Sequence, residues 1–175
     1  MNVLEAIKQR REITSFEQKE LPDDIVQKII ESAYLSPSGN NLPSKEFIIV
    51  RTRETLDYLA QTTPYMPWLR EAMAAVVVIG RPDISKYWLQ DTSIACGFIW
   101  LNAVDLGLGA AFGAVYHSED EKESEQRESY VRSKLHIPED RRVVAIIGMG
   151  YPKKLPAPKI LPPIEETIYD EKFTE

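Results

Sequence analysis

Two polar motifs near the start of the sequence have the residue types that hold a phosphorylated, planar ligand. The first is the pair Arg10-Arg11, and the second is the loop 36–41, Ser-Pro-Ser-Gly-Asn-Asn, which precedes an apolar strand expected at 47–50. An arginine fork makes two parallel charge-assisted hydrogen bonds to a phosphate. Serine, glycine and asparagine offer hydroxyls, amides and close backbone approach to ring edges. Each motif alone is also typical of a solvated helix end or a turn, so their order and spacing carry the argument.

Three later segments extend this pattern over nearly the whole chain. They are Asp-Thr-Ser-Ile-Ala at 91–95 with Leu-Gly-Leu-Gly at 106–109, Ile-Ile-Gly-Met-Gly-Tyr-Pro at 146–152, and Pro-Ile-Glu-Glu at 163–166. With the two motifs above, this order resembles the nitroreductase family of FMN-dependent oxidoreductases. The resemblance implies an α+β fold with a mixed central sheet flanked by helices, a homodimer, and a domain-swapped C-terminal arm over about 153–175.

The resemblance also implies cofactor contacts, position by position. The arginine pair matches the residues that contact the FMN phosphate and ribityl chain, and the loop matches one that reaches the flavin from the other subunit. Gly113 and Ala114 match, within one residue, the backbone near the flavin N5, and Lys159 matches a C-terminal cation aimed at the phosphate. The full implied set of cofactor-binding residues is Arg10, Arg11, Glu12, Thr14, Pro37, Ser38, Gly39, Asn41, Gly113, Ala114 and Lys159.

Two single residues and one tripeptide depart from the family pattern. Glu12 stands where a small hydroxyl residue is usual, and its carboxylate repels a phosphate unless one of the neighbouring arginines pairs with it. Thr14 stands where many members carry a cation that stabilises the reduced flavin. Pro43-Ser44-Lys45 replaces the usual Gln-Pro-Trp, and Lys45 is the first candidate for the missing positive charge.

The sequence offers no catalytic side chain of its own, and a flavin enzyme needs none because the cofactor carries the electrons. It lacks a Gly-x-Ser-x-Gly elbow and a Gly-x-x-x-x-Gly-Lys phosphate loop. The single cysteine, Cys96, lies in an apolar helix and is expected to be an inert core thiol. His117 and His136 lack ligand spacing to that cysteine, so no zinc site is expected.

The function expected from the resemblance is an FMN-dependent oxidoreductase that passes electrons from NADH or NADPH to nitroaromatic, quinone or similar flat small-molecule acceptors. Two alternatives remain open at this point. The departures at Glu12 and Thr14 also fit a catalytically eroded, flavin-binding or regulatory homologue. A specialised flavin chemistry, such as reductive dehalogenation or flavin breakdown, is the other alternative.

Composition favours one domain spanning 1–175. The chain has a mass of 20.0 kDa, no linker-like segment and a formal net charge of -6, which argues against a nucleic-acid partner. Its start lacks the basic and apolar segments of a signal peptide, and no apolar run reaches the ~20 residues of a membrane span. A cytoplasmic protein without a membrane partner is therefore expected.

Hydrophobic periodicity predicts alternating helices and strands. Helices are expected at about 3–10, 22–34, 53–59, 86–106 and 118–135, and strands at 47–50, 74–79, 110–115 and 143–149. The helix at 86–106 is apolar on nearly every side, which indicates that a partner subunit covers part of it. The aromatic run 65–68 is interpreted as a packed connection, with a lid over the flavin as the alternative.

Overall fold

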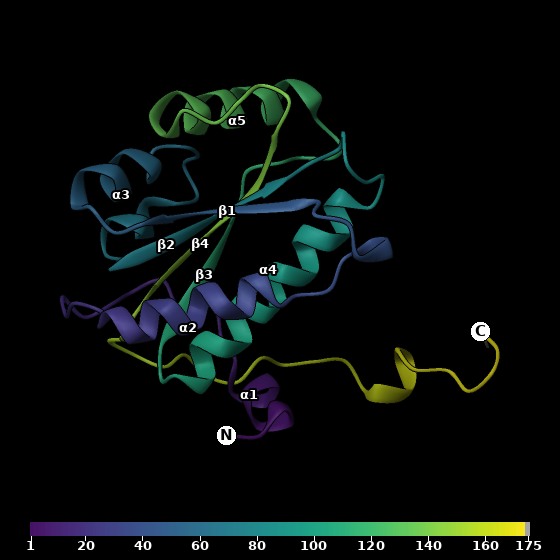
Figure 1. Cartoon of the computed structure of the whole chain (residues 1–175). Coiled ribbons are helices and arrows are strands. Elements are labelled where there is room, and N and C mark those ends of the chain that lie inside the picture. Colours follow the sequence, from purple (N-terminus) through teal and green to yellow (C-terminus); the bar gives the residue numbers. More distant parts are fainter. Residues whose placement is uncertain (174–175) are drawn as a thin grey trace.

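A four-stranded antiparallel sheet lies between two layers of helices in this computed structural model, which describes residues 1–173 (Figure 1). The strands, in the spatial order β1-β2-β4-β3, are β1 (Lys45–Val50), β2 (Ala74–Gly80), β4 (Arg142–Gly150) and β3 (Gly109–Ala114). Every residue of β2 is buried, because this strand has a neighbour on each edge and a helix layer on each face. The β-branched residues of this valine-rich strand suit that environment.

Alternation along β2 divides the core between the two layers. Ala75, Val77 and Ile79 face one layer, whereas Val76 and Val78 face the other. The first layer contains α3 (Arg53–Leu59), the short helix η2 (Pro67–Arg70) and α5 (Glu121–Leu135). The second layer contains α2 (Asp23–Tyr34) and α4 (Trp88–Asp105), and α1 (Val3–Gln9) packs against α4. The chain also forms two further short helices, η1 (Gly39–Asn41) and η3 (Ile164–Glu166).

The apolar helix predicted at 86–106 is α4, which crosses one face of the sheet. Its residues Ala95, Ile99 and Ala103 are fully buried against the sheet. On its other side, Ile94 and Phe98 are 43% and 42% exposed. The structure therefore confirms the helix and shows that a single subunit leaves part of its apolar surface in water.

The α+β class is confirmed, and the differences from expectation concern details of the sheet. All four strands are antiparallel, and within 1–173 the parallel pairing is limited to an isolated bridge between Glu12 and Ala110. The strand predicted as buried at 47–50 begins at Lys45, and only Val50 is buried. The physical reason is its place at the sheet edge, where one side has no neighbouring strand. The acidic run begins its helix at Glu121 rather than at 118, after an Asp120 cap.

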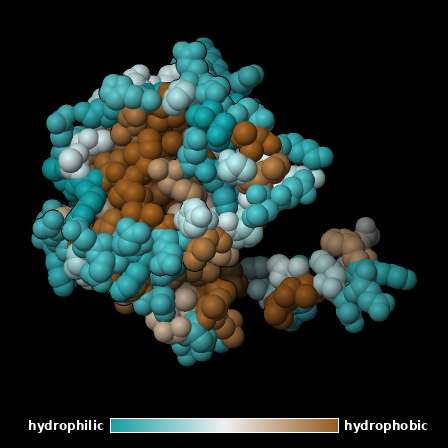
Figure 2. All heavy atoms as spheres, viewed as in Figure 1, coloured by the Kyte–Doolittle hydropathy of each residue, from teal (hydrophilic) through white to brown (hydrophobic). Residues whose placement is uncertain are grey.

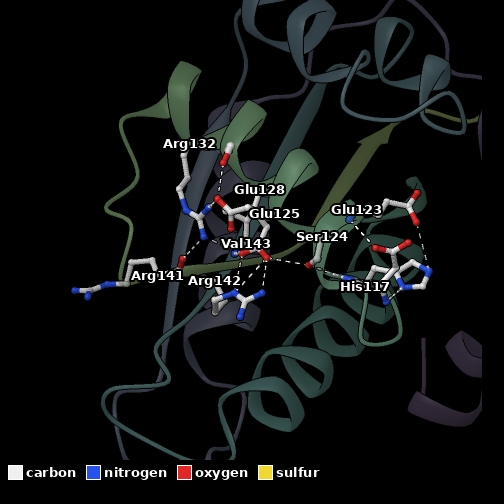
Figure 3. A network of polar contacts seen from close by, with 11 residues as sticks. His117, Glu123, Ser124, Glu125, Glu128, Arg132, Arg141, Arg142 and Val143 are labelled. Atoms are coloured by element: carbon white, nitrogen blue, oxygen red, sulfur yellow. Dashed lines mark hydrogen bonds and ion pairs between the residues drawn. The ribbon is translucent and has the colours of Figure 1, made fainter.

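A buried carboxylate joins the outer helix α5 to the sheet (Figure 3). Glu128 is completely buried, and its two oxygens accept hydrogen bonds from the Ser124 hydroxyl at 3.0 Å, Arg142 Nη2 at 2.7 Å, Arg132 Nη2 at 3.1 Å and the Val143 backbone N–H at 2.8 Å. Removing such a charge from water is costly unless every acceptor site is used, and here both oxygens have partners. The network fixes α5 over the end of β4.

The C-terminal segment leaves the body as an extended arm after a short pairing near Pro152 (Figure 1). Figure 2 shows hydrophobic residues along this projecting arm, and Ile160 is 95% exposed. The described part of the arm makes no strand pairing beyond that point within 1–173. Residues 174 and 175 of the expected arm lie outside the described residues. An extended arm is therefore present, while its exchange between subunits stays a prediction.

Candidate functional site

The arginine pair lies at the end of α1, beside the C-terminal half of α4. Arg10 ends the helix, and its guanidinium lies 4.7 Å from the ring centroid of Trp100. The Trp100 indole N–H donates to the Arg11 carbonyl at 3.3 Å, which fixes the chain at this point. Neither arginine forms an ion pair with a carboxylate among residues 1–173. The guanidinium groups of two adjacent residues therefore lack a carboxylate partner in the described chain.

Arg11 leaves a polar group unsatisfied within the protein. Its Nη1 donates to the carbonyls of Lys8 at 2.8 Å and Arg10 at 2.7 Å, but its Nε is buried without a hydrogen-bond partner in the described chain. A buried donor without an acceptor costs free energy, so such groups commonly mark a ligand position. A phosphate satisfies both the donor and the charge. The residues present therefore fit the phosphate of the FMN that the family resemblance implies.

Glu12 forms no ion pair with either arginine within residues 1–173 and binds the edge strand β3. Its Oε1 accepts the Phe112 backbone N–H at 2.9 Å, and the next residue, Ile13, donates its N–H to the Ala110 carbonyl at 3.0 Å. Burial raises the pKa of Glu12 above its ordinary value, and the Phe112 N–H and the Arg10 charge oppose that rise. The pairing with an arginine that would offset phosphate repulsion is absent from the described residues. Instead, this carboxylate aligns the segment that carries Thr14.

Thr14 lines a cavity of about 420 Å³ whose other walls come from the connection between α3 and β2. The remaining lining residues are Pro64, Tyr65, Pro67, Trp68 and Glu71. Within the aromatic run, Met66 is buried against Gly113, where a Cβ would stand 1.9 Å from its sulfur. The packed connection predicted for 65–68 therefore holds for Met66. Tyr65, in contrast, is 78% exposed at the rim of the cavity.

The loop 36–41 is anchored to the other end of α4 by a residue that sequence reasoning did not single out. The buried carboxylate of Asp91 accepts the Gly39 backbone N–H at 2.8 Å and the Ser44 hydroxyl at 2.5 Å. Asn40 and Asn41 adopt left-handed backbone angles, with φ of 54° and 56°, which asparagine tolerates better than most residues. An acid in the first turn of an apolar helix was the available signal, because such a charge needs partners when it is buried.

The ammonium group of Lys45 is hydrogen-bonded within its own chain. Its ammonium donates to the Ser36 carbonyl, to the Ser36 hydroxyl at 2.7 Å and to the Pro37 carbonyl at 2.9 Å. An ammonium has three donors, and these three contacts use all of them. Desolvation lowers the pKa of Lys45, and the charge of Asp91 opposes the shift. Lys45 therefore stabilises the loop rather than supplying a free charge.

Within one chain, the loop 36–41 and the arginine pair lie far from each other. The loop is bound at Asp91 and the arginines at Trp100, nine helical positions away, which corresponds to about 13 Å along α4. Figure 1 shows the same separation, with the segment before β1 at one end of α4 and α1 toward the other. Thus, the loop 36–41 and the arginine pair form two separate clusters within one subunit.

The other predicted residues lie at two further places. Gly113 belongs to β3 and is buried, so its missing side chain is required by the close approach of Met66. Ala114 is exposed, and its carbonyl accepts from Arg127 Nη1 at 3.3 Å. Lys159 lies exposed in the C-terminal arm and forms no ion pair or hydrogen bond within residues 1–173. The chain alone does not bring Lys159 into contact with the arginine pair.

Cys96 behaves as the sequence predicts. It is buried, and desolvation raises the pKa of its thiol to about 12, which keeps it in the unreactive thiol form at neutral pH. The described residues contain no group of three or more metal-ligating side chains. Among them, no helix is long and apolar enough to cross a membrane.

Comparison with known proteins identifies the family. The chain matches the model of the nitroreductase family over residues 7–64 and 59–151. It is 36% identical over 164 residues to a Methanothermobacter thermautotrophicus protein named "Putative NADH dehydrogenase/NAD(P)H nitroreductase", covering 92% of this chain and 83% of that protein.

Solved structures agree with that match. A protein of the same name from Parabacteroides distasonis has a TM-score of 0.88 at 29% identity, with 99% of this chain and 100% of that chain covered. An FMN-dependent nitroreductase from Clostridium difficile has a TM-score of 0.86 at 28% identity, with 97% and 99% covered. These matches agree with the unpaired arginines and with the binding of the next residues, Glu12 and Ile13, to the edge strand β3. The chain therefore belongs to the nitroreductase family.

Proposed function

We propose that this protein is an FMN-dependent oxidoreductase that takes electrons from NADH or NADPH and passes them to flat acceptors such as nitroaromatics and quinones. The observation that carries the proposal is the arginine pair, two guanidinium groups without carboxylate partners in residues 1–173 and with a buried, unsatisfied Arg11 Nε. The similar Clostridium difficile protein is FMN-dependent by name. When bound, FMN accepts a hydride from the nicotinamide and delivers electrons to the acceptor.

The roles of the protein's own residues follow from their positions. Arg10 and Arg11 hold the phosphate, and the Glu12 carboxylate, by binding β3, fixes the chain that presents Thr14 to the cavity. The loop 36–41 is anchored about 13 Å along α4 from this cluster and does not contact the arginine pair, so we propose that it reaches the site from a second subunit. The protein's contribution is thus to bind, orient and shield the cofactor.

An absorbance spectrum tests the proposal directly. The purified protein, supplied with FMN, is expected to retain a yellow chromophore through gel filtration and to lose its absorbance on anaerobic addition of NADH or NADPH. Recovery of the absorbance on adding a nitroaromatic or a quinone completes the cycle. Retained flavin that neither nucleotide bleaches would instead support the catalytically eroded, flavin-binding alternative.

The exposed apolar surface around α4 supports a homodimer. Residues of α1, α2 and α4 surround an apolar cavity of about 710 Å³, and Phe98 contributes to its wall. The exposed large apolar residues on these three helices include Val3, Leu4, Ile7, Tyr34, Ile94 and Phe98. Exposed apolar residues gathered on packed helices mark an interaction surface, and a second copy that also supplies the loop 36–41 fits it. The C-terminal arm is proposed to lie across that partner.

We expect a dimer that persists at micromolar concentration in sedimentation, since such interfaces commonly bury more than ~2,000 Å². Phe98→Glu places a charge in the apolar contact and is expected to shift the protein toward monomer and to release FMN. The matched control is Gln126→Glu on α5, an exposed site in the opposite helix layer. A wild-type protein that sediments as a folded monomer would refute the dimer.

Thr14→Arg is expected to raise the two-electron potential of the bound flavin and to speed its reduction by NAD(P)H. A unit charge a few Å away at an effective dielectric near 20 is worth about 2 to 4 kcal/mol. Glu71 lines the same cavity and neutralises part of the new charge, so we expect a rise of tens of millivolts rather than the full effect. The measurement is a redox titration against a reference dye. A potential unchanged within error would place Thr14 away from the ring.

A further inference from the structure

Glu71 presents an oriented carboxylate to the cavity beside Thr14. One of its oxygens, Oε2, accepts three hydrogen bonds, from the Ser15 hydroxyl at 3.1 Å, the Phe16 backbone N–H at 3.2 Å and Lys153 Nζ at 2.9 Å. These donors come from two segments far apart in the sequence, so the side chain cannot rotate without losing contacts in both. These three hydrogen bonds therefore orient the carboxylate in the absence of a ligand.

The second oxygen of the same carboxylate, Oε1, has no hydrogen-bond partner among residues 1–173, and the Glu71 side chain is 43% exposed. Glu71 lines the cavity, whereas Lys153 is not among the lining residues. The ammonium of Lys153 holds the pKa of Glu71 below its ordinary value, aided by the Phe16 N–H and the Ser15 hydroxyl. This carboxylate consequently stays charged throughout the neutral pH range, and its free oxygen is an unused acceptor.

The remaining walls of the cavity suit a flat ring. Tyr65, Trp68 and two prolines provide them, and the Trp68 indole N–H already donates to the Tyr65 carbonyl at 3.1 Å. With that donor satisfied, the indole offers the cavity an apolar ring surface. Thr14 adds a hydroxyl that makes no hydrogen bond within the described chain. Apolar walls with a few convergent polar atoms are the usual composition of a small-molecule site.

We propose that this cavity is the acceptor subsite, and that Glu71 Oε1 selects flat aromatic acceptors carrying a positive or N–H donor group over acceptors carrying a carboxylate. The proposal rests on the proposed function and names the substrate class of the same site. A donor group forms a charge-assisted hydrogen bond to Oε1. An anionic substituent meets a fixed like charge, which disfavours it.

Binding of two unreactive ligands of similar shape tests this selection. Benzamidinium carries a planar N–H fork, and benzoate carries a carboxylate at the same ring position. Titration calorimetry is performed on FMN-saturated protein, so that the phosphate occupies Arg10 and Arg11 and neither attracts benzoate. We expect benzamidinium to bind about tenfold more tightly than benzoate, because one charge-assisted hydrogen bond changes the Kd by about that factor. Equal affinities in the wild-type protein would overturn the proposal.

Substitutions then assign the preference to one residue. Glu71→Gln keeps an acceptor for the Ser15, Phe16 and Lys153 donors but removes the charge, and the tenfold preference should fall to about threefold or less. Lys153→Met removes the countercharge behind Glu71 and should strengthen the preference. The matched control is Glu54→Gln, which removes a carboxylate that also pairs with a lysine, Lys134, outside the cavity.

Turnover separates failure of this inference from failure of the proposed function. The kcat/KM values for 4-nitrobenzamidine and 4-nitrobenzoate should show the same preference and the same loss in Glu71→Gln. NAD(P)H bleaching with no charge preference would overturn the selection by Glu71 and leave the oxidoreductase function intact. A charge preference in a protein whose flavin is not reduced would support the subsite and overturn the function instead. An unchanged preference in Glu71→Gln would exclude Glu71 as the selecting residue.

Discussion

Replacing Arg10 and Arg11 together with alanine is expected to raise the Kd for FMN by about 100-fold or more, because the protein then lacks both cations for the phosphate. Charge-assisted hydrogen bonds of this kind contribute about 1.5 to 3 kcal/mol each. Two of them therefore contribute about 3 to 6 kcal/mol, and each 1.4 kcal/mol is a factor of about ten. Fluorescence titration of FMN into the apoprotein measures the change.

Arg141→Ala provides the matched control for that double substitution. Arg141 belongs to the other adjacent arginine pair in the sequence, but it is engaged with Glu46 at 2.8 Å and with Asp140 at 2.6 Å. Because its charge is already paired, we expect FMN affinity to stay within about twofold of wild type. If the Arg10/Arg11 variant also stays in that range while remaining folded, the phosphate lies elsewhere and the site assignment is wrong.

Glu128→Ala is expected to lower the free energy of unfolding by about 3 to 5 kcal/mol, the usual cost of removing one partner from a buried charge network. The substitution removes the carboxylate that accepts from Arg142 and the Val143 N–H, and it leaves Arg132 with only the Arg141 carbonyl and Glu125 as partners in the described chain (Figure 3). For a chain of this length, the melting temperature should fall by about 6 to 20 °C. Thermal unfolding followed by circular dichroism, at saturating FMN for every variant, measures the effect.

The neighbouring position separates burial from charge. Glu125 also pairs with Arg132, at 3.6 Å, but it is largely exposed. Glu125→Gln should therefore change stability by about 1 kcal/mol or less. Glu128→Gln keeps an acceptor for Ser124 and Val143, so its loss of unfolding free energy should lie between those of Glu128→Ala and Glu125→Gln. A Glu128→Ala variant as stable as Glu125→Gln would show that α5 contributes little to the cooperative fold.

The predicted helices and strands follow from signals that are local in the chain. The valines of β2 alternate between the two helix layers, so their periodicity could be identified before the layers were known. The boundaries of β1 could not be predicted, because an apolar run has the same sequence pattern in a central strand and in an edge strand. The position of a strand within a sheet depends on distant pairings, here the order β1-β2-β4-β3.

The candidate site also combines features that could be predicted from the sequence with features that could not. Residue type and spacing were enough to select the arginine pair, the loop 36–41 and the inert Cys96, because charge, turn chemistry and burial are properties of short segments. The partners of these residues were not predictable. Asp91 anchors Gly39 from 52 positions away, and Glu12 binds Phe112 from 100 positions away.

The sequence by itself therefore determined the elements, the family resemblance and the candidate residues for binding a phosphate. Only the tertiary structure decided how the charges are used: Lys45 is hydrogen-bonded to its own loop, Glu12 is bound to β3, and Glu71 lines a cavity and has one carboxylate oxygen without a hydrogen-bond partner among residues 1–173. The physical reason is that a side chain's charge is fixed by its chemistry, whereas its availability depends on donors and acceptors that folding brings from distant segments.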